Sequence, residues 1–146
     1  MLRTLTRLRR DDNGSATVEI VILAPVFLMV LLLIVGLGRI QMAGNSTESA
    51  AGNGARAATL QGDQASADNA AEQAVRDSLT SNGINCQQLT INLDTSAVEN
   101  QLGQVGTVTV DITCVVSLSD ISVPGLPGNY TLNATGTSPI NPYSER

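Results

Sequence analysis

Residues Ile20 to Leu37 form a run of eighteen residues without a charged side chain. At a rise of about 1.5 Å per residue, an α-helix of this length extends about 27 Å. The hydrocarbon core of a membrane is about 30 Å thick, and the flanking residues Val18 and Gly38 make up the difference. The run therefore predicts one membrane-spanning helix. Pro25 lies inside it and predicts a kink, which membrane helices tolerate.

The charges on the two sides of this run differ in sign. Residues 1–14 contain four arginines and two aspartates, a net charge of +2, and because the whole chain carries −5, residues 15–146 carry −7. The positive-inside rule then places the amino terminus in the cytoplasm and the remainder outside. Arg39 closes the run and can extend its side chain to the far interface. An acidic distal part also argues against a nucleic-acid partner, which requires a positive surface.

The apolar run also has two simpler interpretations, a cleavable secretory signal and an uncleaved signal anchor. A cleavable secretory signal would have an apolar region of about 7–15 residues followed by an Ala-x-Ala-like site. Here the run is longer, and residues 36–43 make a poor site of that kind. An uncleaved signal anchor is the other interpretation. In a plain signal anchor Glu19 would have no role, whereas an acid at the beginning of a membrane span is rare and indicates a function.

An arginine-rich leader ends at Gly14, and Glu19 is the fifth residue after it. This arrangement resembles the type IV prepilin class of signals. The order Gly14-Ser-Ala-Thr-Val-Glu-Ile-Val-Ile-Leu-Ala-Pro25, with Gly36-Leu-Gly38-Arg39 after it, more closely resembles TadE-like proteins. These are the minor pseudopilins of tight-adherence (Tad/Flp) pilus systems. The resemblance covers roughly residues 7–60, and the tail from Tyr130 to Tyr143 is also similar to the strand and tail that close many such proteins.

The resemblance implies a maturation step and a set of partners. A prepilin peptidase would cut between Gly14 and Ser15 on the cytoplasmic face, leaving a new amine one helical turn from Glu19. The Glu19 carboxylate then favours the positive end of its own helix, or it pairs with the amine of a neighbouring subunit and sets the register between them. The implied partners are the lipid membrane, the peptidase, other pilins or pseudopilins and the Tad secretion machinery. The alternative is an uncleaved single-pass membrane protein whose extracytoplasmic domain binds another envelope component.

Beyond the run, residues 40–60 are rich in alanine and glycine. Ala51 and Ala55 have the small-xxx-small spacing that lets helices approach closely. Glycines weaken a helix by about 1 kcal/mol each relative to alanine. We therefore predict one long, partly interrupted helix over residues 15–60 that packs against sister helices. A flexible Gly/Ala linker is the alternative.

The remaining sequence predicts a helix and three strands. Helical spacing of apolar residues follows Gly62, with Asp63 or Ser66 as the N-cap, and ends at Asn82-Gly83. Three later segments alternate apolar and polar residues, which predicts a small antiparallel sheet covered by the 63–81 helix and the outer part of the long helix. The expected fold class is α+β and pilin-like. Its expected parts are a cytoplasmic leader (1–14), a transmembrane and extended helix (15–60), an extracytoplasmic helix and sheet domain (61–138) and a flexible tail (139–146).

Cys86 and Cys114 are the only cysteines, and both lie on the side predicted to be outside the cytoplasm. An even number of cysteines in an oxidising compartment favours a disulfide. On the chain-entropy model this bond would stabilise the domain by roughly 3–4 kcal/mol. Two free buried thiols are the alternative, since Cys114 lies on the apolar side of its strand. Without histidine, the two cysteines make a poor metal site.

Catalytic patterns are missing from the sequence. There is no histidine, the commonest general base, and there is no phosphate-binding loop, nucleophile elbow or His-Glu-x-x-His motif. The carboxylate pairs Asp94 with Glu99 and Asp111 with Asp120 are better explained as solvated strand and loop positions. We therefore expect neither enzymatic activity nor a cofactor or metal.

Overall fold

The computed structural model describes residues 13–101, 103–121 and 127–143. The chain divides into two compact units, Met1–Ile34 and Val35–Arg146. Helix α1, which extends from Asn13 to Thr59, contributes to both units. Residues 1–12 of the predicted leader lie outside the described residues.

In the first unit, the part of α1 from Val18 to Ile34 has large apolar side chains that are exposed on every side of the helix. Their exposed fractions range from 44% at Leu31 to 74% at Met29. The helix continues through Pro25. The structure thus has one helix that is long and apolar enough to cross a membrane among the residues it describes, as the sequence predicts.

The second part of α1 corrects the prediction of an interrupted helix. α1 is continuous to Thr59 and passes through Gly52 and Gly54 without a break. A Cβ atom at Gly54 would lie 2.7 Å from Cγ2 of Val75, so the missing side chain leaves room for helix α2 to pack. This packing offsets the intrinsic weakness of glycine in a helix. The alternative of a flexible linker is therefore wrong.

Helix α2 extends from Gln64 to Ser81, within the predicted boundaries. Its N-cap is Asp63, whose Oδ1 accepts a hydrogen bond of 2.9 Å from the backbone N–H of Ser66. It ends at the cap Asn82 and at Gly83, where φ is +70°, as a helix-terminating glycine allows. One face of the helix is buried through side chains four residues apart, which are Ala67, Ala71, Val75 and Leu79.

The three strands form an antiparallel sheet in the order β1-β2-β3. The strands are β1 (Cys86–Asp94), β2 (Thr107–Ser117) and β3 (Asn129–Pro139). Ile112 in the middle of β2 lies opposite Ile91 of β1 and Ala134 of β3. A short 3-10 helix, η1 (Ser96–Glu99), follows β1, and a single helical turn, α3 (Leu118–Ile121), follows β2. The predicted α+β fold with its three-stranded antiparallel sheet is confirmed.

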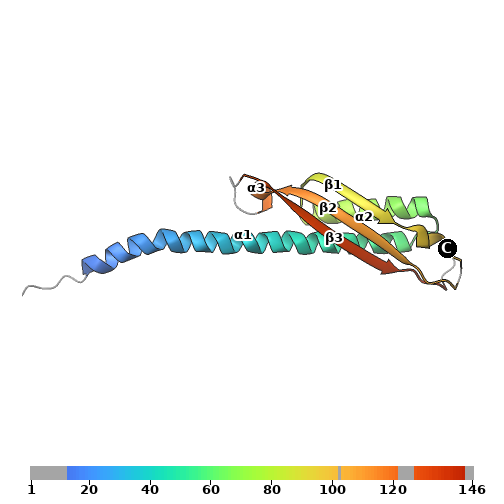
Figure 1. The fold of residues 1–146 in the computed structure, drawn as a ribbon, viewed down its shortest axis with the longest axis horizontal. Helices are drawn as coiled ribbons and strands as arrows, with labels where there is room; N and C mark the ends of the chain where they lie inside the picture. The colour runs from blue at the N-terminus through green and yellow to red at the C-terminus, as the bar shows by residue number, and fades with distance from the viewer. Residues whose placement is uncertain (1–12, 102, 122–126, 144–146) are drawn as a thin grey trace, which may run out of the picture. The chain divides into compact units, whose positions relative to one another are not determined.

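The core lies between this sheet and the two helices of the second unit (Figure 1). β2 contributes alternate side chains that are almost completely buried, which are Val108, Val110, Ile112, Cys114 and Val116. The helices oppose them mainly with alanines. The prediction that the 63–81 helix and the outer part of the long helix cover the sheet is therefore confirmed.

The small residues of α1 pack differently from the prediction. Ala51 and Ala55 are fully buried in the core of their own unit. A Cβ atom at Gly136 of β3 would overlap the backbone of Ala51 and Gly52, so strand and helix backbones lie in direct contact. These side chains are therefore not available to sister helices, because the chain's own sheet covers them.

The carboxyl-terminal segment after β3 is held by backbone hydrogen bonds in the described residues. The N–H of Ile140 donates to the carbonyl of Gly106 at 2.9 Å, and the N–H of Gly103 donates to the carbonyl of Pro142 at 2.8 Å. The side chain of Ile140 is buried. Proline at the last position of β3 is compatible with pairing because β3 is an edge strand.

Candidate membrane-anchoring and assembly site

The predicted cleavage and assembly residues lie at the beginning of α1. Gly14 and Ser15 belong to its first turn, and Glu19 lies four residues after Ser15. Residues at this spacing share one face of a helix, so the Glu19 carboxylate and the position of the Ser15 amide lie on the same side. Glu19 is exposed. The structure thus brings Ser15 and Glu19 onto one face, as expected for a continuous helix.

The helix that follows has the surface of a lipid-facing segment. From residue 13 to residue 38, Glu19 is the only charged residue. The apolar side chains are exposed around the whole circumference rather than along one stripe. A helix that is apolar all round is stable only in an apolar environment. In this part of α1, that environment has to be lipid or the apolar helices of other proteins.

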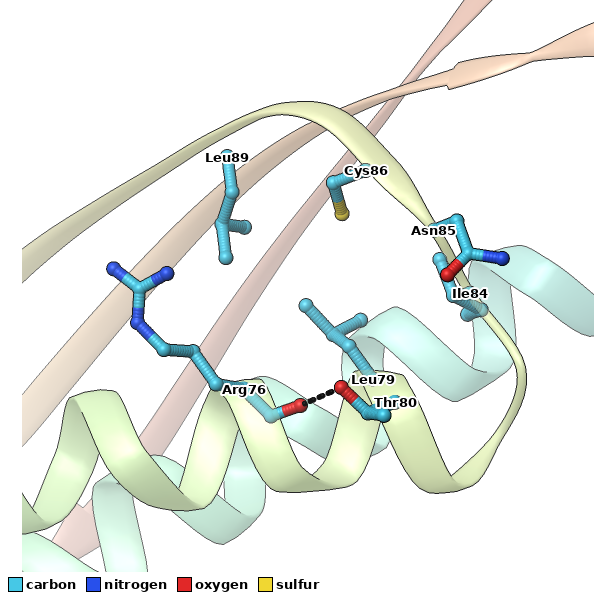
Figure 2. Close-up of a pocket in the computed structure, with 7 residues that line it drawn as sticks. All are labelled: Arg76, Leu79, Thr80, Ile84, Asn85, Cys86 and Leu89. Carbon is cyan, nitrogen blue, oxygen red and sulfur yellow. Dashed lines mark hydrogen bonds between the residues drawn. The ribbon is translucent and has the colours of Figure 1, made fainter.

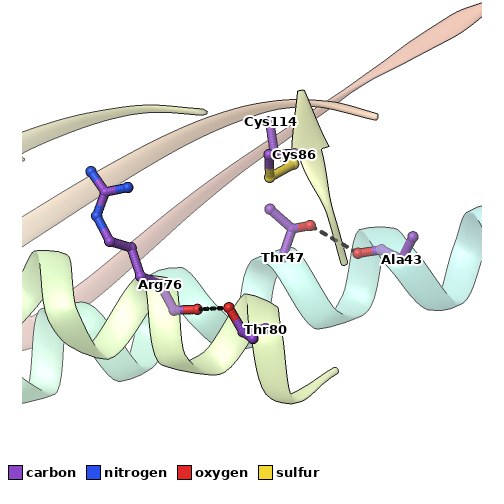
Figure 3. Close-up of a disulfide and its surroundings, with 6 residues drawn as sticks. All are labelled: Ala43, Thr47, Arg76, Thr80, Cys86 and Cys114. Atoms are coloured by element: carbon purple, nitrogen blue, oxygen red, sulfur yellow. Dashed lines mark hydrogen bonds between the residues drawn. A yellow bond between two sulfur atoms is a disulfide. The ribbon is translucent and has the colours of Figure 1, made fainter. Parts of the chain in front are cut away.

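Cys86 and Cys114 are joined by a disulfide (Figure 3). The bond links β1 to β2 near a register shift between Cys86 and Gln88, with a Cα–Cα distance of 5.3 Å. Cys114 is fully buried, whereas Cys86 is half-buried. On α1, which faces the sheet here, the buried hydroxyl of Thr47 donates a hydrogen bond of 2.9 Å to the carbonyl of Ala43. The disulfide therefore links the edge strand β1 covalently to the central strand β2. The buried hydroxyl of Thr47 beneath it has a hydrogen-bond partner.

A cavity of about 360 Å³ lies between the second half of α2 and the beginning of β1 (Figure 2). Leu79 and Leu89 supply apolar walls, and Arg76 and Cys86 also line the cavity. The hydroxyl of Thr80 donates to the carbonyl of Arg76 at 2.8 Å. The guanidinium of Arg76 is 3.6 Å from the Glu72 carboxylate, in an (i, i+4) arrangement on α2. Among the described residues that line the cavity there is no carboxylate.

The carboxylates weighed as catalytic pairs have structural hydrogen bonds. Asp94 accepts a bond of 2.7 Å from the Ser96 hydroxyl, and Asp111 accepts one from the Thr135 hydroxyl across the strand pair. Both aspartates are exposed. The side chain of Asp120 lies outside the described residues. In the described ranges no group of three or more histidine, cysteine or acidic side chains is placed to hold a metal ion.

One carboxylate has a shifted pKa. The backbone N–H of Ser66, and then its hydroxyl, donate to Asp63 and lower the pKa of this N-cap carboxyl below its ordinary value of 3.8. The charged form therefore stabilises the beginning of α2.

Two structural contacts were missed by sequence reasoning. Gly136 occupies an inward position of β3, and an inward glycine in a strand is a signal for close approach of another backbone. Thr95 is buried and donates a hydrogen bond of 2.5 Å to Asp68 of α2, which ties the end of β1 to that helix. No local pattern indicates this second contact, because its partners are 27 residues apart.

Residues 14–56 match the family model described as TadE-like protein. In this segment, the chain is similar to TadE-like proteins. The TadE-like segment begins at Gly14 and ends within α1. It therefore contains Glu19, the apolar run and most of the buried small residues of α1. It is narrower than the predicted range of 7–60 and leaves α2 and the sheet unmatched. No curated protein and no solved structure matches the chain.

The TadE-like segment and the apolar helix lie in the same part of the chain. Together they support a membrane-anchored protein related to the Tad pilus system. TadE-like proteins are pilus components, and enzymatic activity is not known in that family.

Proposed function

We propose that the protein is a pseudopilin that is processed after Gly14 by a prepilin peptidase and acts in the assembly of a Tad/Flp-type pilus. One observation carries the proposal. The TadE-like match begins at Gly14, which is the residue after which the leader would be cut. The protein acts here as a substrate of the peptidase and as a part of the assembly, not as a catalyst.

In this proposal, the protein passes once through the cytoplasmic membrane with residues 1–14 in the cytoplasm and the second unit outside. The four arginines of the leader support this orientation through the positive-inside rule. The disulfide between Cys86 and Cys114 supports it independently, since such bonds persist in oxidising compartments and are rare in the cytosol.

Glu19 provides the assembly contact. Its carboxylate lies at the beginning of the apolar run, where an unpaired charge is costly once neighbouring helices exclude water. Cleavage creates an α-amine on Ser15, and the Glu19 of one subunit can pair with the Ser15 amine of the next. Removing one partner of such a pair leaves a charge in an apolar environment, so the pair fixes the register of neighbouring helices.

The burial of α1 limits which part of the helix makes these contacts. Between Ala43 and Ala58, five alanines of α1 belong to the core formed with the chain's own sheet and α2, which are Ala43, Ala50, Ala51, Ala55 and Ala58. The side chains from Val18 to Leu37 are exposed. Subunits therefore pack through the large apolar side chains of the run, not through the small-xxx-small pair at Ala51 and Ala55.

The deciding experiment is a comparison of two glycine substitutions in native membranes. Gly14→Phe is expected to block cleavage, because the peptidase must accommodate the residue at the cut. Gly38→Phe is the matched control on the same helix, since a Cβ at Gly38 would meet nothing within 4 Å. Intact-mass spectrometry of the full chain should show loss of residues 1–14 from the wild type and from Gly38→Phe only.

Two results of this experiment count against the proposal. An intact leader on the wild-type protein would contradict processing. A Gly14→Phe variant with the same mass loss as the wild type would show that cleavage does not depend on Gly14. The first result favours the uncleaved single-pass protein whose extracytoplasmic domain binds another envelope component. The second would mean that the leader is removed by a protease that does not recognise Gly14.

A further inference from the structure

A second cavity, of about 190 Å³, lies between α1 and the turn that connects α2 to β1. Its lining combines polar groups with apolar ones. Arg39, Ser46 and Asn82 supply a guanidinium, a hydroxyl and an amide, while Met42 and Ile84 supply apolar surface. Such a mixture suits an amphiphile with an anionic head and an apolar body.

The segments that line this cavity are free of acidic residues. Between Glu19 and Glu48 the only charged residue is Arg39, and between Asp77 and Asp94 there is none. Residues 15–146 are otherwise strongly acidic, as their net charge of −7 shows. Among the described residues, neither of the two segments that line the cavity therefore brings a carboxylate to it. This distribution complements an anionic ligand.

The position of the cavity along α1 matches the headgroup layer of a membrane. Arg39 follows Leu37, the last residue of the apolar run, by two residues, or about 3 Å along the helix. Ser46 lies about 10 Å beyond Arg39. The polar headgroup layer on each side of a bilayer is about 5–8 Å thick. A helix that places the apolar run in the hydrocarbon core therefore places Arg39 and Met42 among the headgroups.

We propose that this cavity binds the headgroup of a membrane phospholipid through its phosphate. The inference requires the membrane anchoring of the proposed function but not the cleavage of the leader. The planar guanidinium of Arg39 matches two phosphate oxygens, and its five N–H donors allow it to serve more than one acceptor. One amide N–H of Asn82 donates to the carbonyl of Ser78 at 2.7 Å, and the other amide N–H and the Ser46 hydroxyl provide further donors.

The apolar side of the cavity distinguishes a lipid from a free phosphate ion. Met42 is 71% exposed and lies one helical turn beyond Arg39, on the aqueous side of a phosphate bound there, where the carbon atoms of the headgroup alcohol of a phosphatidylglycerol would lie. Inorganic phosphate gains nothing from this surface. A bound lipid uses both parts of the lining and holds α1 and the α2–β1 turn together at the membrane surface.

The test is native mass spectrometry of the full chain, released from mild detergent that contains phosphatidylglycerol. The wild type is expected to retain one phosphatidylglycerol. Arg39→Gln is expected to reduce this retention roughly fivefold, the effect of one arginine near an anionic surface. Arg39→Lys should restore part of it, because lysine keeps the charge but loses the planar fork. Arg56→Gln is the matched control on the same helix, exposed and outside the cavity.

A second pair of variants tests the acid-free lining without altering Arg39. Asn82→Asp places a carboxylate in the cavity and should lower lipid retention at least as much as Arg39→Gln. Gln73→Glu adds the same charge to an exposed position of α2 outside the cavity and should leave retention unchanged. Far-UV circular dichroism melting of each variant shows whether it is folded. If Arg39→Gln is unfolded, the Asn82→Asp pair decides.

Three outcomes would overturn the inference. Equal losses in Arg39→Gln and Arg56→Gln would indicate unspecific attraction to the acidic lipid. Equal retention of a diacylglycerol with the same acyl chains would show that the phosphate is not recognised. Displacement of the lipid by inorganic phosphate at equal concentration would assign the cavity to the free ion. The leader can be intact or cleaved in any of these cases, so failure here is distinct from failure of the proposed maturation.

Discussion

Helix α1 has two stretches that use opposite chemistry within one continuous element. From Val18 to Leu37 most of its side chains are large, apolar and exposed. From Ala43 to Ala58 they are mostly small, and Ala50, Ala51, Ala55 and Ala58 are fully buried. The large side chains of the first stretch project into its surroundings. The side chains of the second stretch are small, so that a sheet and a helix can approach its backbone.

This difference shows that hydrophobic burial depends on size and partner as well as on polarity. In the first stretch, the exposed area of each side chain stabilises the protein only when lipid or another apolar helix covers it. In the second, each alanine contributes little area, but close approach of β3 and α2 gives dense packing. The same helical backbone thus serves as an anchor in one half and as the base of a core in the other.

The sharpest way to break this comparison is to exchange side-chain size between the two stretches. Ala51→Leu places three extra carbon atoms in a fully buried site and is expected to destabilise the second unit by about 3 kcal/mol. Leu31→Ala removes the same atoms from an exposed site and should leave the unfolding of that unit unchanged. Urea unfolding of the full chain in detergent, followed by far-UV circular dichroism, measures both. Similar midpoints for the two variants would contradict the division.

A second test concerns the backbone contact between β3 and α1. Gly136→Ala adds a methyl group that would overlap the backbone of Ala51, and we expect a loss of about 2 kcal/mol. Gly44→Ala is the matched control on α1, since a Cβ there would meet nothing within 4 Å. This control should stabilise the protein by about 0.5–1 kcal/mol, because alanine is the better helix former. Denaturant midpoints should therefore move in opposite directions, and a shift of both in the same direction would refute the contact.

The smallest expected effect lies outside α1, at the beginning of the helix that covers its buried half. The pKa of Asp63 is lowered by the Ser66 backbone N–H, so its stabilisation is present above its ordinary pKa of 3.8 and is lost as the pH falls through the lower folded value. Asp63→Asn keeps an N-cap that does not titrate. The variant should lose less stability than the wild type between pH 5 and about pH 3. Asp77→Asn, an exposed change on the same helix, serves as the control, and identical pH profiles for all three proteins would argue against the cap.

Much of the fold follows from local patterns in the sequence. The N-cap at Asp63, the stop at Asn82-Gly83 and the alternation along β2 are each specified by residues close together in the chain, and the structure has all of them. Long-range contacts were harder to predict. The direction in which Ala51 and Ala55 face, the approach of Gly136 and the cavity beside Arg39 each depend on segments that are far apart in sequence.

By itself, the sequence determined the apolar span, the TadE-like order from Gly14 to Arg39 and the α+β succession of elements. These properties depend on composition and on short-range periodicity, which no tertiary contact alters. Only the tertiary structure decided what covers the small residues of α1. A stripe of alanines can pack against a sister helix or against the chain's own sheet equally well. In this protein it packs against the sheet, because the missing side chain of Gly136 lets β3 lie directly on the Ala51 backbone.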